Sequence, residues 1–202
     1  MNDNELANFW NQQVPDKFKH YIGSDFDQKK DIYVNQVSKE LLSNIPLNSF
    51  SKNDVIIDWG VGGGLFSNIL SNYGQLIGLD IAQTSLDKAK SHLQQNDRAY
   101  HQAILINELS SLHDLLTLNV KLIFSVSVIQ HFVSIKYWEE IVSLWNIISP
   151  EYLAIQTRHG KTNEDHPETY FDSEKNYILG LKLTTDEVVN SFSKQYNVIY
   201  HN

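Results

Sequence analysis

The sequence predicts an α/β fold, in which helices cover both faces of a doubly wound, mostly parallel sheet. Over residues 54–202, short apolar runs rich in β-branched residues alternate with helical apolar patterns, and this alternation is typical of parallel sheets. The first run, residues 55–57, leads into an acid and a glycine-rich segment, Asp58–Gly64, that opens the next helical pattern. Glycines at such a turn let the backbone approach a ligand closely. The fold class and a ligand loop are therefore predicted together.

The apolar periodicity also places the individual elements. We expect strands near residues 54–58, 76–80, 99–103, 121–126, 152–157 and 196–200. We expect helices near residues 65–72, 83–95, 107–116, 135–148 and 185–194. Apolar residues at helical spacing in the fourth of these helices are predicted to be core: Trp138, Ile141, Val142, Trp145 and Ile148. Thr184 followed by Glu187 is typical of a helix start.

Composition limits the classes of function. The chain has 202 residues, 42% apolar and 20% charged, as expected for one globular domain. No apolar run approaches the ~20 residues of a bilayer span, so no membrane partner is expected. A polar N-terminus and the absence of cysteine favour a cytoplasmic protein without disulfides or thiolate metal sites. A net charge of −8 argues against a nucleic-acid partner.

The glycine segment does not match the common nucleotide-binding patterns. The dinucleotide pattern G-x-G-x-x-G needs a third glycine where this chain has Leu65 or Ser67, and no Gly-Lys-Ser/Thr follows. Asp58 would also repel a pyrophosphate. A nicotinamide-dependent oxidoreductase is therefore disfavoured.

The segment instead resembles the first motif of the class I S-adenosylmethionine-dependent methyltransferases, an acid followed by x-G-x-G-x-G. Asp58, Gly60, Gly62 and Gly64 fill all four positions. A second signature, an acid that ends the second strand, is similar to Asp80, 20 residues after Gly60. The run 122–132 looks like the family's fourth-strand segment. The resemblance implies a Rossmann-like methyltransferase fold and a small-molecule type of enzyme.

This resemblance also implies a cofactor, S-adenosylmethionine, with S-adenosylhomocysteine as product. Asp58 would lie near its methionine portion, the loop backbone beneath it, and Asp80 on both ribose hydroxyls, where charge-assisted hydrogen bonds are strong. The other predicted contacts are Val61, Ile81, Ile104 and Ser125. The adenine contact stays open between the backbone of residues 103–104 and the side chains of Asn107 or Glu108.

The family pattern raises two further expectations about the ends of the chain. We assign residues 1–53, with helices around 5–13 and 28–42, as an N-terminal helical lid segment, and residues 54–202 as the methyltransferase domain. The aromatic residues of the first segment either cover the cofactor or anchor the helices to the core: Phe9, Trp10, Phe18 and Tyr21. The family's seventh strand is either missing here or replaced by a strand at residues 177–181.

Catalytic candidates follow the fourth and fifth strands, because ligands of open α/β sheets bind beyond the carboxyl ends of strands. His131 is the first choice for a base that removes a proton from the acceptor, although a packing role is equally open. His159 and Tyr21 are weaker candidates. Arg158, which could pair with an acidic acceptor, is a predicted substrate contact together with Gln130 and Phe132.

Several subclasses lack their residues in this chain. Family members that methylate amino groups of bases or glutamine carry a proline motif after the fourth strand, and the segment 125–128 contains no proline. Metal-dependent members need carboxylates at this place, and the serines of this segment cannot replace them as Mg²⁺ ligands. We therefore expect a metal-independent enzyme, monomeric or homodimeric, that methylates an oxygen or nitrogen of a small molecule. The alternatives are a non-catalytic methyltransferase-like binding or scaffold subunit, and a protein or peptide methyltransferase.

Overall fold

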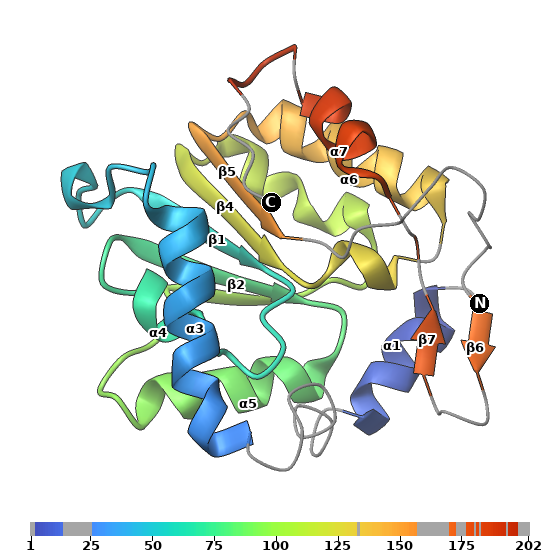
Figure 1. Cartoon of the computed structure of the whole chain (residues 1–202), viewed down its shortest axis with the longest axis horizontal. Helices are drawn as coiled ribbons and strands as arrows, with labels where there is room; N and C mark the ends of the chain where they lie inside the picture. The colour runs from blue at the N-terminus through green and yellow to red at the C-terminus, as the bar shows by residue number, and fades with distance from the viewer. Residues whose placement is uncertain are drawn as a thin grey trace.

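The computed structural model describes residues 3–13, 26–132, 134–156, 170–172, 177–179, 181, 183–192 and 194–197. Its centre is a five-stranded sheet of order β3-β2-β1-β4-β5 in which every neighbouring pair runs parallel (Figure 1). The strands are β1 (Val55–Trp59), β2 (Gln75–Asp80), β3 (Gln102–Leu105), β4 (Val120–Val126) and β5 (Tyr152–Gln156). The strand order reverses between β1 and β4, where open α/β sheets bind their ligands.

Helices cover both faces of this sheet, as predicted. One face packs against α3 (Phe26–Leu42), α4 (Ser67–Leu70) and α5 (Gln83–Gln94), and the other against η2 (Leu109–Thr117), α6 (Ile135–Ile148) and α7 (Thr185–Phe192). The remaining described elements are α1 (Asp3–Gln13), η1 (Leu47–Ser49), η3 (Ile129–His131), β6 (Tyr170–Asp172) and β7 (Tyr177–Leu179). No helix within the described ranges is long and apolar enough to cross a bilayer.

Alternation along β1 explains its sequence. Val55, Ile57 and Trp59 join the core on the α6 face, whereas Ile56 joins the core on the α3 face, because successive side chains of a strand point to opposite sides. With both faces covered, the strand is apolar along almost its whole length. Asp58 is the exception: it is a carboxyl group only 4% exposed in a central strand.

The predicted helices around α6 and α7 are confirmed in detail. Four of the five predicted core residues of α6 are buried, and Val142 is half-buried beside them. At α7, the Glu187 N–H donates to Thr184 Oγ1 (3.2 Å) and the Thr184 N–H donates to Glu187 Oε2 (2.7 Å). This reciprocal pair is a capping box.

Some boundaries differ from those predicted. Helix α4 is only four residues long because the glycine-rich loop and its turns occupy the positions before Ser67. Residues 109–117 form a 3₁₀ helix, and β3 begins at Gln102 rather than at residue 99. The strand predicted over 196–200 is wrong at Tyr196, whose N–H bonds to Phe192 O in a turn after α7. Residues 198–200 lie outside the described residues.

The run at residues 177–181 does supply a strand outside the main sheet. β7 pairs antiparallel with β6 in a separate two-stranded sheet. The Leu181 N–H then donates to Phe132 O (3.3 Å), which ties this small sheet to the segment after β4. One of the two alternatives stated for the seventh strand is thereby found among the described residues.

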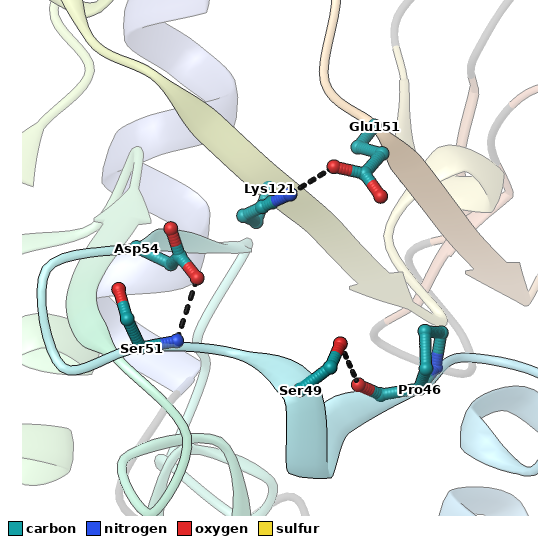
Figure 2. A network of polar contacts seen from close by, with 6 residues as sticks. All are labelled: Pro46, Ser49, Ser51, Asp54, Lys121 and Glu151. Atoms are coloured by element: carbon teal, nitrogen blue, oxygen red, sulfur yellow. Dashed lines mark hydrogen bonds and ion pairs between the residues drawn. The ribbon is translucent and has the colours of Figure 1, made fainter.

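At the amino ends of the strands, the polar contacts are local and largely exposed (Figure 2). The Ser51 N–H donates to Asp54 Oδ2 (2.7 Å), Ser49 Oγ donates to Pro46 O (2.7 Å), and Lys121 Nζ pairs with Glu151. The first two contacts fix the segment that leads into β1, and the third joins β4 to the residue before β5.

Candidate functional site

The glycine-rich loop after β1 adopts a backbone that favours glycine. Gly60, Gly62 and Gly64 have φ values of 77°, 51° and 77°, in the left-handed region that L side chains rarely enter. The N–H groups of Gly60 and Val61 both donate to Leu79 O, at 2.8 and 3.0 Å. The loop therefore turns across the carboxyl end of β2.

Two of these glycines also permit close contacts with other segments. A Cβ at Gly60 would lie 2.4 Å from Val128 Cγ2, and a Cβ at Gly64 would lie 2.9 Å from Ala89 Cα in α5. Real Cβ atoms do not approach that closely. The missing side chain of Gly60 thus leaves room for the segment after β4, and that of Gly64 leaves room for the backbone of α5.

Asp80 ends β2 and holds this loop. It is 8% exposed; its Oδ2 accepts the Gly62 N–H and its Oδ1 accepts the Ala82 N–H, both at 2.9 Å. Burial raises its pKa to about 6, although the Ala82 and Gly62 N–H groups favour the charged form. A carboxylate has about four acceptor positions, so Asp80 can fasten the loop and still bind a ligand hydroxyl.

Asp58 lies at the end of β1 in a buried polar chain. Ser67 Oγ donates to Asp58 Oδ2 (2.5 Å) and is also 2.6 Å from the Tyr100 hydroxyl. Burial raises the pKa of Asp58 to about 7; the Ser67 hydrogen bond lowers this pKa and the charge of Asp80 raises it. Sequence reasoning missed Ser67 and Tyr100, because no motif links them.

The other predicted cofactor contacts surround the loop. Val61 is buried with Leu86 and Ala89 of α5, whereas Ile81 and Ile104 are half-buried at the edge of the core. Ser125 of β4 is fully buried, and its Oγ has no hydrogen-bond partner among the described residues. Buried hydroxyls normally have partners, so a ligand atom at this position would satisfy one.

The segment after β4 carries the predicted catalytic and substrate residues. Gln130 is buried and His131 half-buried in η3. Phe132 is buried in the core, where its ring meets Tyr137 at 5.1 Å between centroids. His131 lies edge-on to the ring of Trp10, with 4.7 Å between centroids.

Trp10 belongs to α1, which is anchored on the opposite side of the glycine-rich loop as well. The Thr84 N–H, at the start of α5, donates to Asn11 Oδ1 (3.2 Å). Thr84 follows β2 and His131 follows β4, and β1 lies between these strands. The end of α1 is therefore tied to the segments on both sides of the β1 end.

A polar cluster at the ends of β4 and β5 was also missed by sequence reasoning. Ser127 has a φ of 59°, its N–H donates to Gln156 O (3.0 Å), and its Oγ donates to Gln156 Oε1 (3.3 Å). The Tyr33 hydroxyl of α3 is 3.5 Å from the same Oε1. Non-glycine residues with a left-handed backbone cluster at functional sites. This conformation of Ser127 could not be predicted from the sequence, because serine adopts it only rarely.

Three predicted site residues, Tyr21, Arg158 and His159, lie outside the described residues, as does Phe18 of the N-terminal aromatic set. Their roles stay predictions. Within the described ranges, no group of three His, Cys, Asp or Glu residues could hold a metal ion.

Comparisons with known proteins agree with this geometry. Residues 57–146 match a family model described as a methyltransferase domain. The magnesium protoporphyrin IX methyltransferase of Synechocystis PCC 6803, crystallised with bound S-adenosylmethionine, is 15% identical with a TM-score of 0.56, over 96% of this chain and 86% of that one. A S-adenosylmethionine-dependent methyltransferase from Leishmania major is 14% identical with a TM-score of 0.61, over 96% and 72%.

A third structure, the geranyl diphosphate C-methyltransferase of Streptomyces coelicolor A3(2), is 11% identical with a TM-score of 0.57, over 96% of this chain and 78% of that one. A search of curated proteins found no match. The structural likenesses confirm the predicted Rossmann-like methyltransferase fold. The domain match over residues 57–146 and this fold together make the chain similar to the S-adenosylmethionine-dependent methyltransferases.

Proposed function

We propose that the protein is a S-adenosylmethionine-dependent methyltransferase that acts, without a metal, on an oxygen or nitrogen of a small molecule. The observation that carries the proposal is the pairing of Asp80 with the glycine-rich loop. One buried carboxylate accepts the Gly62 N–H at 2.9 Å, and a glycine backbone lies beside it. This arrangement suits a ligand with ribose hydroxyls and a cationic tail better than one with a pyrophosphate, which two buried acids would repel.

The bound cofactor supplies an activated methyl group. The protein's part is to align that group with the acceptor and to exclude water. In this proposal Asp80 binds the ribose hydroxyls, Asp58 faces the methionine portion, and the backbone of residues 60–64 supports the ligand. Ser125 Oγ, buried and without a described partner, is placed to bond to it.

His131 is the proposed general base for the acceptor proton. Its position after β4, beyond the carboxyl end of the sheet, is where the reacting groups of open α/β folds gather. The edge-on contact with Trp10 restricts the orientation of the imidazole. An acceptor bound under α1 would be shielded from water by the same indole.

The small-molecule acceptor rests on two supports. Two of the similar structures are named for small acceptors, magnesium protoporphyrin IX and geranyl diphosphate. The net charge of −8 disfavours nucleic acid. A monomer or homodimer in the cytoplasm fits the composition. The scaffold alternative and methylation of a protein or peptide remain distinct outcomes of the experiments below.

Calorimetric titration of the purified protein with S-adenosylmethionine, S-adenosylhomocysteine and NAD tests the cofactor. We expect micromolar binding of both adenosyl ligands and none of NAD. Asp80→Asn keeps the size of the side chain and removes its charge, so it should weaken both adenosyl ligands. The absence of binding by either ligand would contradict the proposal.

A screen of small acceptors for transfer of a labelled methyl group then tests the activity. Once an acceptor is found, His131→Gln should lower kcat by about 10²–10⁴-fold if the residue is the base, with the affinity for S-adenosylmethionine unchanged. Binding of the cofactor without transfer to any small acceptor, but with transfer to protein in a cell extract, would favour the peptide alternative. Binding with no transfer at all would favour the scaffold alternative.

A further inference from the structure

The hydrogen bonds that link Tyr100 to Ser67 and Ser67 to Asp58 join residues that the fold brings together, rather than residues of one local motif. Asp58 is the register partner of Gly78 in β2. A Cβ at Gly78 would lie 2.6 Å from Cε1 of Tyr100, so only glycine at that position leaves space for the ring. The ring of Tyr100 therefore covers the strand beside Asp58, and its hydroxyl reaches Ser67 at the start of α4.

The direction of the hydrogen bonds in this chain follows from the carboxylate. Ser67 has a single O–H, which donates to Asp58 Oδ2 (2.5 Å). The Tyr100 hydroxyl, 2.6 Å from Ser67 Oγ, must then donate to that oxygen. Burial raises the pKa of Tyr100, so its hydroxyl keeps the proton that it donates. These hydrogen bonds therefore supply a donor to one oxygen of Asp58, Oδ2.

The second oxygen of Asp58 has no hydrogen-bond donor among the described residues. The residue is 4% exposed and lies two positions before the first glycine of the loop. A nearly buried carboxylate with one open acceptor position is costly unless a cation or a donor completes it. One carboxylate oxygen of Asp58 therefore accepts a hydrogen bond from the protein, and the other can accept one from a ligand.

We propose that Tyr100 and Ser67 are positioning residues of the cofactor site, which hold the Asp58 carboxylate ionised and oriented for a cationic group bound in the glycine-rich loop. The inference rests on the proposed function, since S-adenosylmethionine is the cationic ligand. Neither residue contacts the ligand in this scheme; both act through Asp58.

The ionisable groups around Asp58 make this role measurable through pH. Burial raises its pKa to about 7, and among the described residues Asp80 of β2 is the charged group that acts on it. Tyr100 faces it in neutral form, α4 contains no titratable residue, and Lys121 of β4 is paired with Glu151 at the other end of the sheet. A cationic ligand binds the ionised carboxylate, so affinity rises with pH and levels off above the pKa of Asp58.

Loss of the Ser67 hydrogen bond removes an interaction that lowers this pKa. In Ser67→Ala, the pKa of Asp58 therefore rises and more of the carboxyl is protonated near neutral pH. A rise of about one pH unit corresponds to roughly tenfold weaker binding of a cation below the pKa and almost no change well above it. Tyr100→Phe should act in the same direction with a smaller effect, since it only weakens the donor.

The experiment is calorimetric titration of the full chain with S-adenosylmethionine between about pH 6 and 9. We expect Ser67→Ala to weaken binding by roughly tenfold near pH 6.5 and by less than about twofold near pH 9. Ser71→Ala is the matched control: this serine lies one turn further along and bonds to Arg98 (2.9 Å) rather than to Asp58. It should leave the pH profile unchanged.

Asp58→Asn supplies the second test. In that background Ser67→Ala should have no further effect on the pH profile, because the group that it tunes no longer titrates. An equal weakening by Ser67→Ala at every pH, or the same shift in the Asp58→Asn background, would overturn the inference while leaving the proposed function intact. No binding by the unmodified protein at any pH would overturn both.

Discussion

The two edges of the central sheet treat their acids in opposite ways. At the amino edge, Glu151 is exposed and paired with Lys121 (Figure 2), and the hydrogen bond from Lys121 lowers the pKa of Glu151. At the carboxyl edge, burial raises the pKa of Asp58 to about 7 and that of Asp80 to about 6. At the amino edge, a nearby lysine stabilises the charge of Glu151. At the carboxyl edge, both carboxyl groups are buried.

This difference suggests that the acids at the amino ends of the strands have a structural role and that those at the carboxyl ends have a functional one. At the amino edge, Glu151 is exposed and paired with Lys121, and Asp54 accepts the Ser51 N–H. The acids of the carboxyl edge are held by backbone N–H groups and by the hydroxyls of Ser67 and Ser85, without a described cation beside them. Perturbed carboxyls in such a setting are typical of ligand sites.

Gly60→Ala should disrupt the carboxyl edge most. The new Cβ would enter a backbone with φ 77° and lie 2.4 Å from Val128 Cγ2. Left-handed strain costs about 1–2 kcal/mol and overpacking about 1–3 kcal/mol, so unfolding free energy should fall by about 2–5 kcal/mol in urea denaturation. Adding Val128→Ala should restore the steric part; if it restores nothing, the close contact is not the cause.

Asp80→Ala should weaken S-adenosylmethionine binding by about 1.5–3 kcal/mol, the usual value of a hydrogen bond to a charged group. Asp54→Ala is the control at the amino edge, because the Asp54 side chain accepts the Ser51 N–H and no other hydrogen bond from the described residues. It should not change the affinity measured by calorimetry. Equal losses in the two variants would mean that Asp80 acts only through the stability of the fold.

Asp58→Asn should change how stability depends on pH. A carboxyl whose pKa rises from 3.8 to about 7 on folding favours the folded state below pH 4, and this contribution is lost as pH rises toward 7. The slope is at most about 1.4 kcal/mol per pH unit. Chemical denaturation from pH 4 to 8 should show a flatter profile for the variant than for the unmodified protein, whereas parallel profiles would contradict the buried state of Asp58.

Lys121→Met should have the smallest effect. The ion pair with Glu151 is exposed, and exposed pairs contribute little because solvent and salt screen them. We expect no measurable change in unfolding free energy or in cofactor affinity. A clear loss of affinity would show that the amino edge communicates with the site, and would remove the contrast drawn here.

The glycine-rich loop and the position of its acids could be predicted from sequence alone. Gly60, Gly62, Gly64 and Asp80 were found because their chemistry depends on spacing along the chain: a left-handed turn needs glycine, and an acid that ends the second strand is carried to the same edge. The helices around Trp138 and Thr184 were predicted for the same local reason, namely apolar periodicity and a capping box.

For the candidate acceptor site, the sequence predicted the position along the chain but not the contacts of its residues. The sequence located Gln130, His131 and Phe132 after the fourth strand but could not show that Phe132 enters the core or that Trp10, more than 100 residues away, lies against His131. The boundaries of α4 and η2 were missed because turn geometry overrides helical apolar spacing over a few residues. Tyr196, where a strand was expected to begin, lies instead in a turn after α7.

The α/β class, the order of the five strands of the main sheet with the helices between them, and the glycine-rich loop with its two acids could all be predicted from the sequence. These follow from backbone sterics and from periodic burial, which act over a few residues. Folding brings Tyr100 to Ser67 across Gly78 and leaves one oxygen of Asp58 without a donor among the described residues, and neither contact could be predicted from sequence. Side chains from distant segments meet there through packing, and burial then sets the ionisation on which the proposed chemistry depends.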